Sequence, residues 1–186
     1  MKYLEGHYYH VYNRGAHKQK IFIENENYLH LISLFKKYSQ RYNVIVAAYC
    51  LMPNHYHLIL RQKASGDIGG FLKTTFNAYT QAINKRYRHS GTLFQGQSKA
   101  KHIDSEEYCL RAIRYVHRNP LSAHLVDSLE DWDYSNYLEW IDLRQGTLAD
   151  FELRSQLFKK PSDYRQFVEN SSDEKRNMEL EKFLFD

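Results

Sequence analysis

The sequence of 186 residues is poor in cysteine and has no long apolar run. Its two cysteines, Cys50 and Cys109, both lie inside apolar stretches, which predicts buried thiols in a reducing cytosol and excludes a zinc site of the paired-cysteine type. No signal peptide and no stretch long enough to span a membrane is found, so we expect a cytoplasmic protein without a membrane partner. Internal repeats and low-complexity tracts are also absent.

Proline is scarce as well, and each of its three copies marks an expected boundary. Pro53 and Asn54 together predict a turn. Pro120 is expected to end a helix one or two residues before it, because its ring clashes with the preceding turn and it has no N–H to donate. Pro161 is expected to interrupt a later helical unit.

Tyrosine, in contrast, is abundant, with 16 copies against 10 Phe and 2 Trp. Such rings can stack on bases, although any one of them is as readily explained as an edge of the core. The net charge of +4 hides an asymmetry, because residues 1–120 hold 18 basic and 7 acidic residues (+11), whereas residues 121–186 hold 8 and 15 (−7). A basic body fits a polyanionic partner, and an acidic end could mask part of it.

Residue periodicity predicts the order strand, helix, strand, strand, helix, strand, followed by a third helix. The expected strands are 7–14, 44–51, a segment starting at His55, and 99–103; apolar stripes predict helices within 28–42 and 72–87. Ser105 is an expected N-cap for the third helix. This order is the ferredoxin-like split βαβ arrangement, an α+β fold with strands one and three central and helices on one face of the sheet.

Beyond the third helix the chain becomes helical and acidic. Its aromatic residues are expected to pack back on the body, and they are Trp132, Tyr134, Tyr137 and Trp140. We therefore predict a catalytic domain over residues 1–125 and a helical acidic extension over residues 126–186. The polar, charged end from Ser171 onward is expected to be loosely attached or disordered.

The central motif is the segment Met52–Leu60, with the sequence MPNHYHLIL. Successive side chains of a strand face opposite ways, so His55 and His57 share one face. Two imidazoles placed in this way on a rigid strand can hold one divalent metal ion. An isolated pair of this kind is more often two surface histidines, so the surrounding motifs decide between these interpretations.

A second motif, the sequence YVHRNP at 115–120, adds a tyrosine and an asparagine to the two histidines of the first. Tyr115 and Asn119 are four residues apart and so lie on one face of a helix. Tyr115 is expected beside the apolar stripe of that helix rather than in the core. The stripe consists of Cys109, Ala112, Ile113 and Val116. His117 is a weaker candidate, as a proton shuttle, and a plain polar contact is the simpler interpretation.

A His-hydrophobic-His strand followed by a helix with one tyrosine resembles the HUH single-tyrosine transposases with an IS200-like domain. Within them, the chain is most similar to the REP-associated tyrosine transposases. The His-Tyr-His piece alone is weakly specific, whereas five matching pieces in one order are strong evidence. These pieces are Tyr12–Gly15, Met52–Leu60, Gly91–Gln95, Arg114–Ala123 and Asp133–Tyr137.

The resemblance implies that the third helix crosses the free face of the sheet, so that Tyr115 reaches the histidines as the nucleophile. His55, His57 and Asn119 would be the metal ligands. The third ligand of the family, four residues after the tyrosine, is often glutamine, so the shorter Asn119 is a modest departure. Imidazole nitrogens with an amide oxygen suit Mg²⁺ or Mn²⁺.

A tyrosine hydroxyl is unreactive at its ordinary pKa of about 10, and a metal ion near the scissile phosphate can offset the developing charge. The expected activity is cleavage and rejoining of single-stranded or hairpin DNA, of inverted-repeat type, through a 5′-phosphotyrosine link. Two alternatives stay open. A replication-initiator or relaxase-type nickase shares this chemistry but is disfavoured by the short chain, and a non-catalytic binder of structured single strands is disfavoured by the missing RNP-type aromatic motif.

Basic residues expected to flank the sheet face or its loops are candidate phosphate contacts. They are Arg14, Lys18, Lys20, Arg61, Lys73, Lys85, Arg86, Lys99 and Lys101. Each one alone is more simply a solvated charge, but the set favours a nucleic-acid surface. The expected partner is DNA, bound by a monomer or a homodimer, and the resemblance implies a monomer with a self-contained site.

Overall fold

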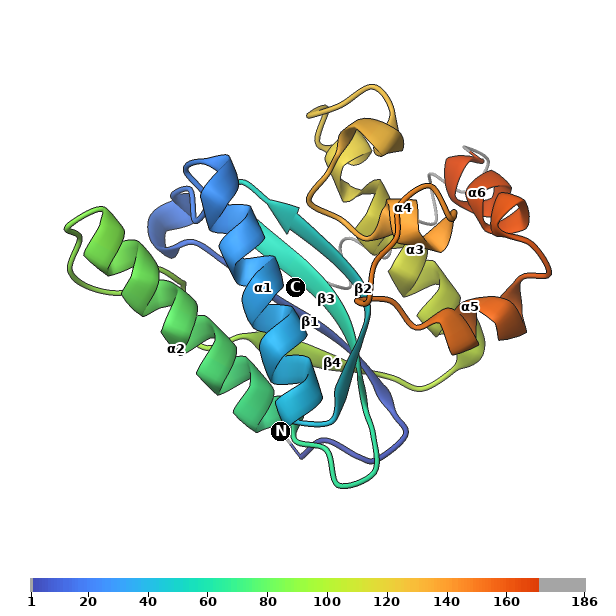
Figure 1. Ribbon diagram of the computed structural model, residues 1–186, viewed down its shortest axis with the longest axis horizontal. Coiled ribbons are helices and arrows are strands. Elements are labelled where there is room, and N and C mark those ends of the chain that lie inside the picture. Colours follow the sequence, from blue (N-terminus) through green and yellow to red (C-terminus); the bar gives the residue numbers. More distant parts are fainter. Residues whose placement is uncertain (1, 171–186) are drawn as a thin grey trace.

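The computed structural model describes residues 2–170 and confirms the predicted α+β fold (Figure 1). Its sheet has four antiparallel strands in the order β2-β3-β1-β4. The strands are β1 (Tyr8–Arg14), β2 (Val44–Met52), β3 (His55–Gln62) and β4 (Lys99–Ile103). Strands β1 and β3 are central, as the ferredoxin-like arrangement requires.

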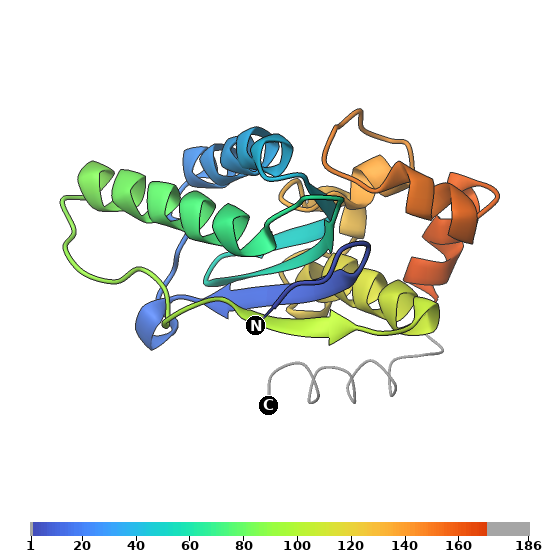
Figure 2. The same ribbon diagram turned by 90° about the horizontal axis from the view of Figure 1, so that it is seen from below.

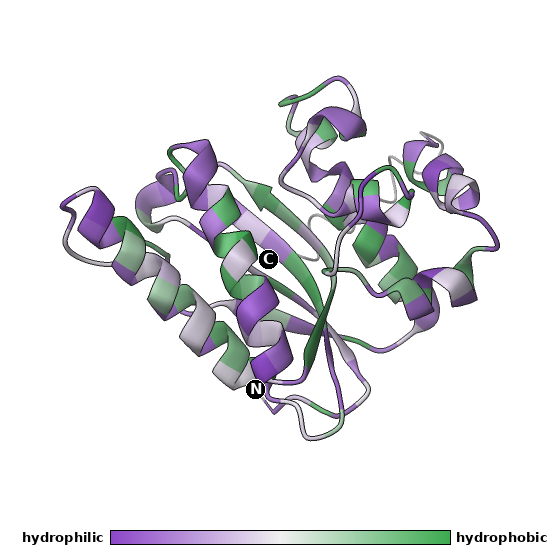
Figure 3. Cartoon of the chain, viewed as in Figure 1, coloured by the Kyte–Doolittle hydropathy of each residue, from purple (hydrophilic) through white to green (hydrophobic). Residues whose placement is uncertain are grey.

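Two long helices, α1 (Asn25–Arg41) and α2 (Ile68–Arg86), lie together on one face of the sheet (Figure 2). Their apolar stripes form one core with alternate residues of the strands, such as Val11 of β1 and Leu58 of β3. Strand β2 and the middle of β3 carry hydrophobic stretches, whereas the helices alternate between hydrophobic and hydrophilic residues (Figure 3). This packing leaves the opposite face of the sheet for the histidine pair.

Helix α3 (Glu106–Ser122) covers that opposite face, as expected. Its residues Ala112 and Val116 share a second core with Cys50 of β2 and Ile59 of β3. The predicted cap is confirmed, because the Ser105 side chain accepts a hydrogen bond from a backbone N–H of the first turn at 3.2 Å. Both cysteines are buried free thiols, as predicted.

The expected end of this helix before Pro120 is wrong, because α3 continues to Ser122. Pro120 lies in the last turn of α3, and this turn still closes through Ala123 N, which donates to Asn119 O at 3.0 Å. The helix ends just before His124, which has a φ of 53°. Asn119 therefore lies in an intact helical turn rather than at a frayed end.

The chain after α3 forms short helical elements on the outer side of α3 (Figure 1). They are η2 (Leu129–Asp131), α4 (Tyr137–Trp140), α5 (Phe151–Leu157) and α6 (Pro161–Glu169). Pro161 opens α6, where a missing N–H is harmless, so it separates the two halves of the predicted unit. Tyr137 and Trp140 are completely buried in the second core, and Tyr134 stacks on Tyr28 of α1 at 3.7 Å, so the aromatic residues pack on the body as predicted.

The segment between η2 and α4 also covers the outer edge of β2. Leu51 N donates to Tyr134 O at 2.9 Å, and Asn136 N donates to Tyr49 O at 3.3 Å. An open strand edge would otherwise present unpaired backbone groups to other chains. The domain boundary after residue 125 stays a prediction, and the expectation for the end from Ser171 lies outside the described residues.

The described chain has one further short element, the 3-10 helix η1 (Ala16–Lys18), directly after β1. Between residues 2 and 170, no helix combines the length and the hydropathy needed to span a bilayer.

Candidate active site

The two histidines of the central motif share one face of the sheet, as predicted. In the register of the central strands, His55 lies opposite Arg14 and His57 lies opposite Tyr12. Directly opposed residues of antiparallel strands point to the same side, so the side chains of Arg14 and Tyr12 flank the histidines. His57 is completely buried and His55 is partly exposed, at the end of β3 that meets the pocket.

His55 contacts two amide oxygens. Its Nδ1 lies 2.7 Å from Asn54 Oδ1, and its Nε2 lies 3.2 Å from Asn119 Oδ1. Burial lowers the pKa of His55, and the contact with Asn119 only partly opposes this, so the neutral ring carries one N–H at pH 7. Asn54 Nδ2 donates to Lys18 O at 3.4 Å, which turns its oxygen toward His55 and places the N–H of the ring on Nδ1.

This arrangement leaves the lone pair of His55 Nε2 facing the Asn119 oxygen, two acceptors 3.2 Å apart. Either the Asn119 amide rotates to donate, or a cation lies between the two atoms. Two neighbouring ligands of an octahedral ion with bonds of about 2.1 Å are roughly 3 Å apart, so the spacing fits a shared ion. Within residues 2–170 no group of three His, Cys, Asp or Glu side chains could hold a metal, so a metal bound to the two histidines would need an amide oxygen as its third protein ligand.

His57 is oriented by a third histidine that sequence analysis missed. Its Nδ1 lies 3.0 Å from Nε2 of His10, and the two rings stack at 5.2 Å. Burial, with His10 and His55 close by, holds the pKa of His57 well below its usual range. Burial, followed by the Lys101 ammonium, lowers the pKa of His10 to about 3. The rings are therefore neutral, which is the form that binds metals.

Tyr115 packs edge-on against these rings, with centroids 5.3 Å from His57 and 6.1 Å from His10. It is only 4% exposed and belongs to the second core, so the expected position outside the core is wrong. Residues 112–120 are buried on all sides, because the sheet covers one side of α3 and the extension covers the other. Helical periodicity reveals one buried face and could not anticipate the second.

His117, two residues after Tyr115, points away from this cluster. Its Nε2 lies 2.8 Å from Asn136 Oδ1, and its Nδ1 lies 2.5 Å from the Tyr164 hydroxyl. Burial lowers the pKa of His117 to about 4, although the contact with Asn136 partly opposes this. The ring makes polar contacts from α3 to the extension, which was the simpler interpretation of its role.

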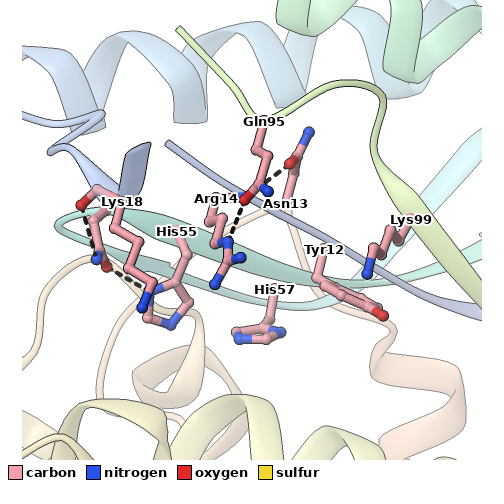
Figure 4. Close-up of a pocket in the computed structure, with 9 residues that line it drawn as sticks. Tyr12, Asn13, Arg14, Lys18, His55, His57, Gln95 and Lys99 are labelled. Carbon is pink, nitrogen blue, oxygen red and sulfur yellow. Dashed lines mark hydrogen bonds between the residues drawn. The ribbon is translucent and has the colours of Figure 1, made fainter. Parts of the chain in front are cut away.

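A pocket of about 430 Å³ opens beside the histidines (Figure 4). Its lining consists of Tyr12, Asn13, Arg14, Lys18, Asn54, His55, His57, Gln95 and Lys99. Arg14 Nε donates to Gln95 Oε1, and Gln95 N donates to Arg14 O at 2.8 Å, so the loop before β4 is fastened to the end of β1. The pocket therefore holds three basic side chains beside the two histidines.

The nine predicted phosphate contacts do not all lie at this site. Arg14, Lys18 and Lys99 line the pocket, Lys101 follows on the same face of β4, and Lys20 is exposed in the loop after η1.

The remaining four basic residues do not line the pocket, and their role as phosphate contacts stays a prediction. Lys73, Lys85 and Arg86 belong to α2, which covers the opposite face of the sheet. Arg61 lies 3.8 Å from the buried carboxylate of Asp150. Strand alternation places Arg61 on the same face of β3 as His55 and His57, beyond the pocket.

The family model of the IS200-like transposases matches residues 3–119. A Haemophilus influenzae protein described as a candidate REP-associated tyrosine transposase is 26% identical over 116 residues, a match that spans 56% of this chain and 65% of that relative. A solved structure of a REP-associated tyrosine transposase bound to a REP hairpin has the same fold, with a TM-score of 0.66 and 16% identity over 82% of this chain and 93% of that one. A candidate transposase from Deinococcus radiodurans has a TM-score of 0.44 and 16% identity over 67% of this chain and 95% of that one.

The family match includes both motifs that carried the resemblance, the histidine strand and the helix with Tyr115 and Asn119. It covers well over half of the chain, and the resemblance seen in the sequence is confirmed. The chain belongs to the IS200-like transposase family.

Proposed function

We propose that this protein is a divalent-metal-dependent DNA strand transferase, which cleaves and rejoins single-stranded or hairpin DNA through a 5′-phosphotyrosine link. One observation carries the proposal: α3 holds Tyr115 against His57 and, one turn later, Asn119 against His55. A tyrosine and three potential metal ligands thus meet under one helix. Family membership supports the reaction class.

His55, His57 and Asn119 would hold the ion, Mg²⁺ or Mn²⁺. When bound, it would polarise the scissile phosphate and offset the charge that develops there. Neighbouring side chains orient the two imidazole rings. Asn54 accepts from the Nδ1–H of His55, and His10 is placed to accept from Nδ1 of His57. With both Nδ1 atoms acting as donors, Nε2 would be the atom of each ring that binds the ion.

Tyr115 would supply the nucleophile. Its phenolic oxygen forms a bond to phosphorus as the phenol gives up its proton to solvent, and the bond from phosphorus to the 3′ oxygen breaks. That oxygen takes up a proton and leaves as a 3′-hydroxyl, while the 5′ phosphate stays on the tyrosine. Attack by another 3′-hydroxyl reverses these changes, so no nucleotide energy source is needed.

Arg14, Lys18 and Lys99 would bind the phosphates next to the scissile one. The Tyr12 ring, 5.9 Å from Lys99 Nζ, belongs to the same pocket lining. Basic side chains combined with an aromatic ring suit an unpaired strand. The similar structure is that of a transposase bound to a REP hairpin, which favours a hairpin with an unpaired flank as the substrate here.

The test is an adduct assay with hairpin DNA labelled on the 3′ side of the cleavage site, in the presence of Mn²⁺. We expect a denaturation-resistant adduct in the wild type and none with Tyr115→Phe. Tyr108→Phe, in the first turns of the same helix, serves as the matched control and should keep the adduct. An adduct that survives in Tyr115→Phe would disprove the assignment, and DNA binding without any adduct would favour a non-catalytic binder.

Transfer of the labelled strand to an added 3′-hydroxyl distinguishes strand transfer from nicking alone. We expect the joined product to accumulate as the covalent adduct disappears. An adduct that forms but never rejoins would favour the nickase alternative.

A further inference from the structure

The side chain of Asn136, between η2 and α4, is completely buried and makes four hydrogen bonds. Its Oδ1 accepts from Tyr49 N at 2.8 Å and lies 2.8 Å from His117 Nε2. Its Nδ2 donates to Ala47 O at 3.1 Å and to Leu148 O at 2.7 Å. Both amide hydrogens and both oxygen lone pairs are used, so the orientation of the amide is fixed.

One of these bonds reaches an irregular point of the sheet. Ala47 lies where β2 shifts register against β3, between Val46 and Ala48. A bulge of this kind leaves backbone groups outside the ladder. The Ala47 carbonyl is satisfied by Asn136 Nδ2 and, at 2.9 Å, by the indole N–H of Trp140. The extension therefore fixes the irregular part of the strand.

The other end of the network belongs to α3. The Asn136 oxygen can only accept, so His117 donates to it from Nε2, and the Nδ1 of His117 accepts from the Tyr164 hydroxyl. His117 lies midway between Tyr115 and Asn119 in the helix. A shift of this ring would therefore move both functional residues.

We propose that Asn136 is a positioning residue, which fixes α3 against β2 at the depth at which Asn119 meets His55 and Tyr115 meets His57. The inference rests on the proposed function of those four residues. It assigns a role to a motif of the extension that the chemistry of the site leaves unused.

The two residues that Asn136 joins, Tyr49 and His117, are both close in sequence to the residues of the proposed site. On the sheet side, Tyr49 is next to Cys50, and Cys50 is the β2 partner of His57. On the helix side, His117 is two residues from the nucleophile and two from the amide ligand. A misplacement of about 1 Å far from the reacting atoms can lower a rate by about 100-fold, so even a small release of the helix should be measurable.

The experiment compares Asn136→Ala with Arg154→Met. Arg154 donates to the carbonyls of Glu139 and Trp140 and pairs with Asp142, all inside the extension, so we expect its loss to report reduced stability alone. Three quantities are measured below the unfolding midpoint of each protein: the single-turnover cleavage rate, the affinity for DNA, and the affinity for Mn²⁺ by electron paramagnetic resonance.

For Asn136→Ala we expect a rate loss between about tenfold and 100-fold and weaker Mn²⁺ binding, with DNA affinity almost unchanged. Arg154→Met should have a lower unfolding midpoint but the wild-type rate and Mn²⁺ affinity. A folded Asn136→Ala protein with the wild-type rate and Mn²⁺ affinity would overturn the proposal, because Asn136 would then contribute to stability only.

Should Asn136→Ala fail to fold, Tyr164→Phe removes only the hydroxyl that bonds His117 and leaves the ring packed. We expect a rate loss of up to about fivefold, the value of one ordinary hydrogen bond, and an unchanged rate would again contradict the proposal. Failure of the proposed function is distinguishable, because the wild type would then form no Tyr115-dependent adduct. The effect of Asn136 on Mn²⁺ affinity would still decide the positioning role.

Discussion

The buried histidines should make the fold labile in mild acid. His10, His57 and His117 are completely buried, and burial lowers the pKa of each one in the folded protein. In the unfolded chain the same side chains titrate at about 6.5. Below that pH the histidines of the unfolded chain bind protons, whereas the same histidines in the folded protein stay neutral. The free energy of unfolding is therefore at its full value above pH 6.5 and decreases as the pH falls.

The loss of stability can be worked out from the folded-state pKa values of His10 and His117. With a pKa of about 3 for His10 and about 4 for His117, each ring loses about 2 kcal/mol of stability between pH 7 and pH 5. His57 adds a loss in the same direction. Because a domain of this kind has a total stability of about 5–15 kcal/mol, a large part of it should disappear by pH 5.

The assay is urea unfolding at pH 7.5, 6 and 5 in the presence of EDTA, which removes any metal contribution. His117→Gln should be less stable than the wild type at pH 7.5, but its loss of stability toward pH 5 should be smaller by about 2 kcal/mol. His89→Gln, at an exposed position, should keep the full pH dependence. A stability that stays constant from pH 7.5 to pH 5 would refute the reasoning.

Three further predictions concern metal and DNA. His57→Ala should abolish cleavage and weaken Mn²⁺ binding while DNA affinity stays within about twofold, and cleavage that persists in EDTA would contradict the metal role. Arg14→Ala should reduce the slope of log affinity against log salt by about 0.7 for a single strand, whereas Lys73→Ala on the opposite face should leave it unchanged, as a salt titration of fluorescence anisotropy would show. Deletion of the residues after Asn170 should leave cleavage intact and non-specific DNA binding equal or slightly tighter, and weaker binding by a folded truncation would make this end part of the recognition surface.

The parts of the site that could be predicted are those fixed by local geometry. Strand alternation is enough to place His55 and His57 on one face, and helical spacing is enough to place Tyr115 and Asn119 one turn apart. The order of elements then indicates which strands are central. Each of these inferences uses residues that are neighbours in the sequence.

The parts that could not be predicted depend on pairings between distant segments. His10 contacts His57 because of the register between β1 and β3, and alternation within β1 gives only the face of His10, not its partner. Tyr115 is buried because the extension adds a second layer over α3, which the periodicity of α3 cannot reveal. The ion pair of Arg61 could not be predicted for the same reason, because its partner Asp150 lies 89 positions further along the chain.

Most of the acidic excess of the sequence lies within the described part of the extension. Residues 121–170 hold 5 basic and 10 acidic residues, a balance of −5, so only −2 of the acidic excess lies after Asn170.

Several acidic residues of the extension form ion pairs with arginines of the described chain. The pairs are Glu139 with Arg144, Asp142 with Arg154, Glu130 with Arg165, and Asp150 with Arg61. A carboxylate already paired with an arginine is poorly placed to compete with DNA for the basic pocket. The acidity of the extension is therefore in part taken up by ion pairs within the described chain, and masking of a DNA surface by the acidic end stays a prediction.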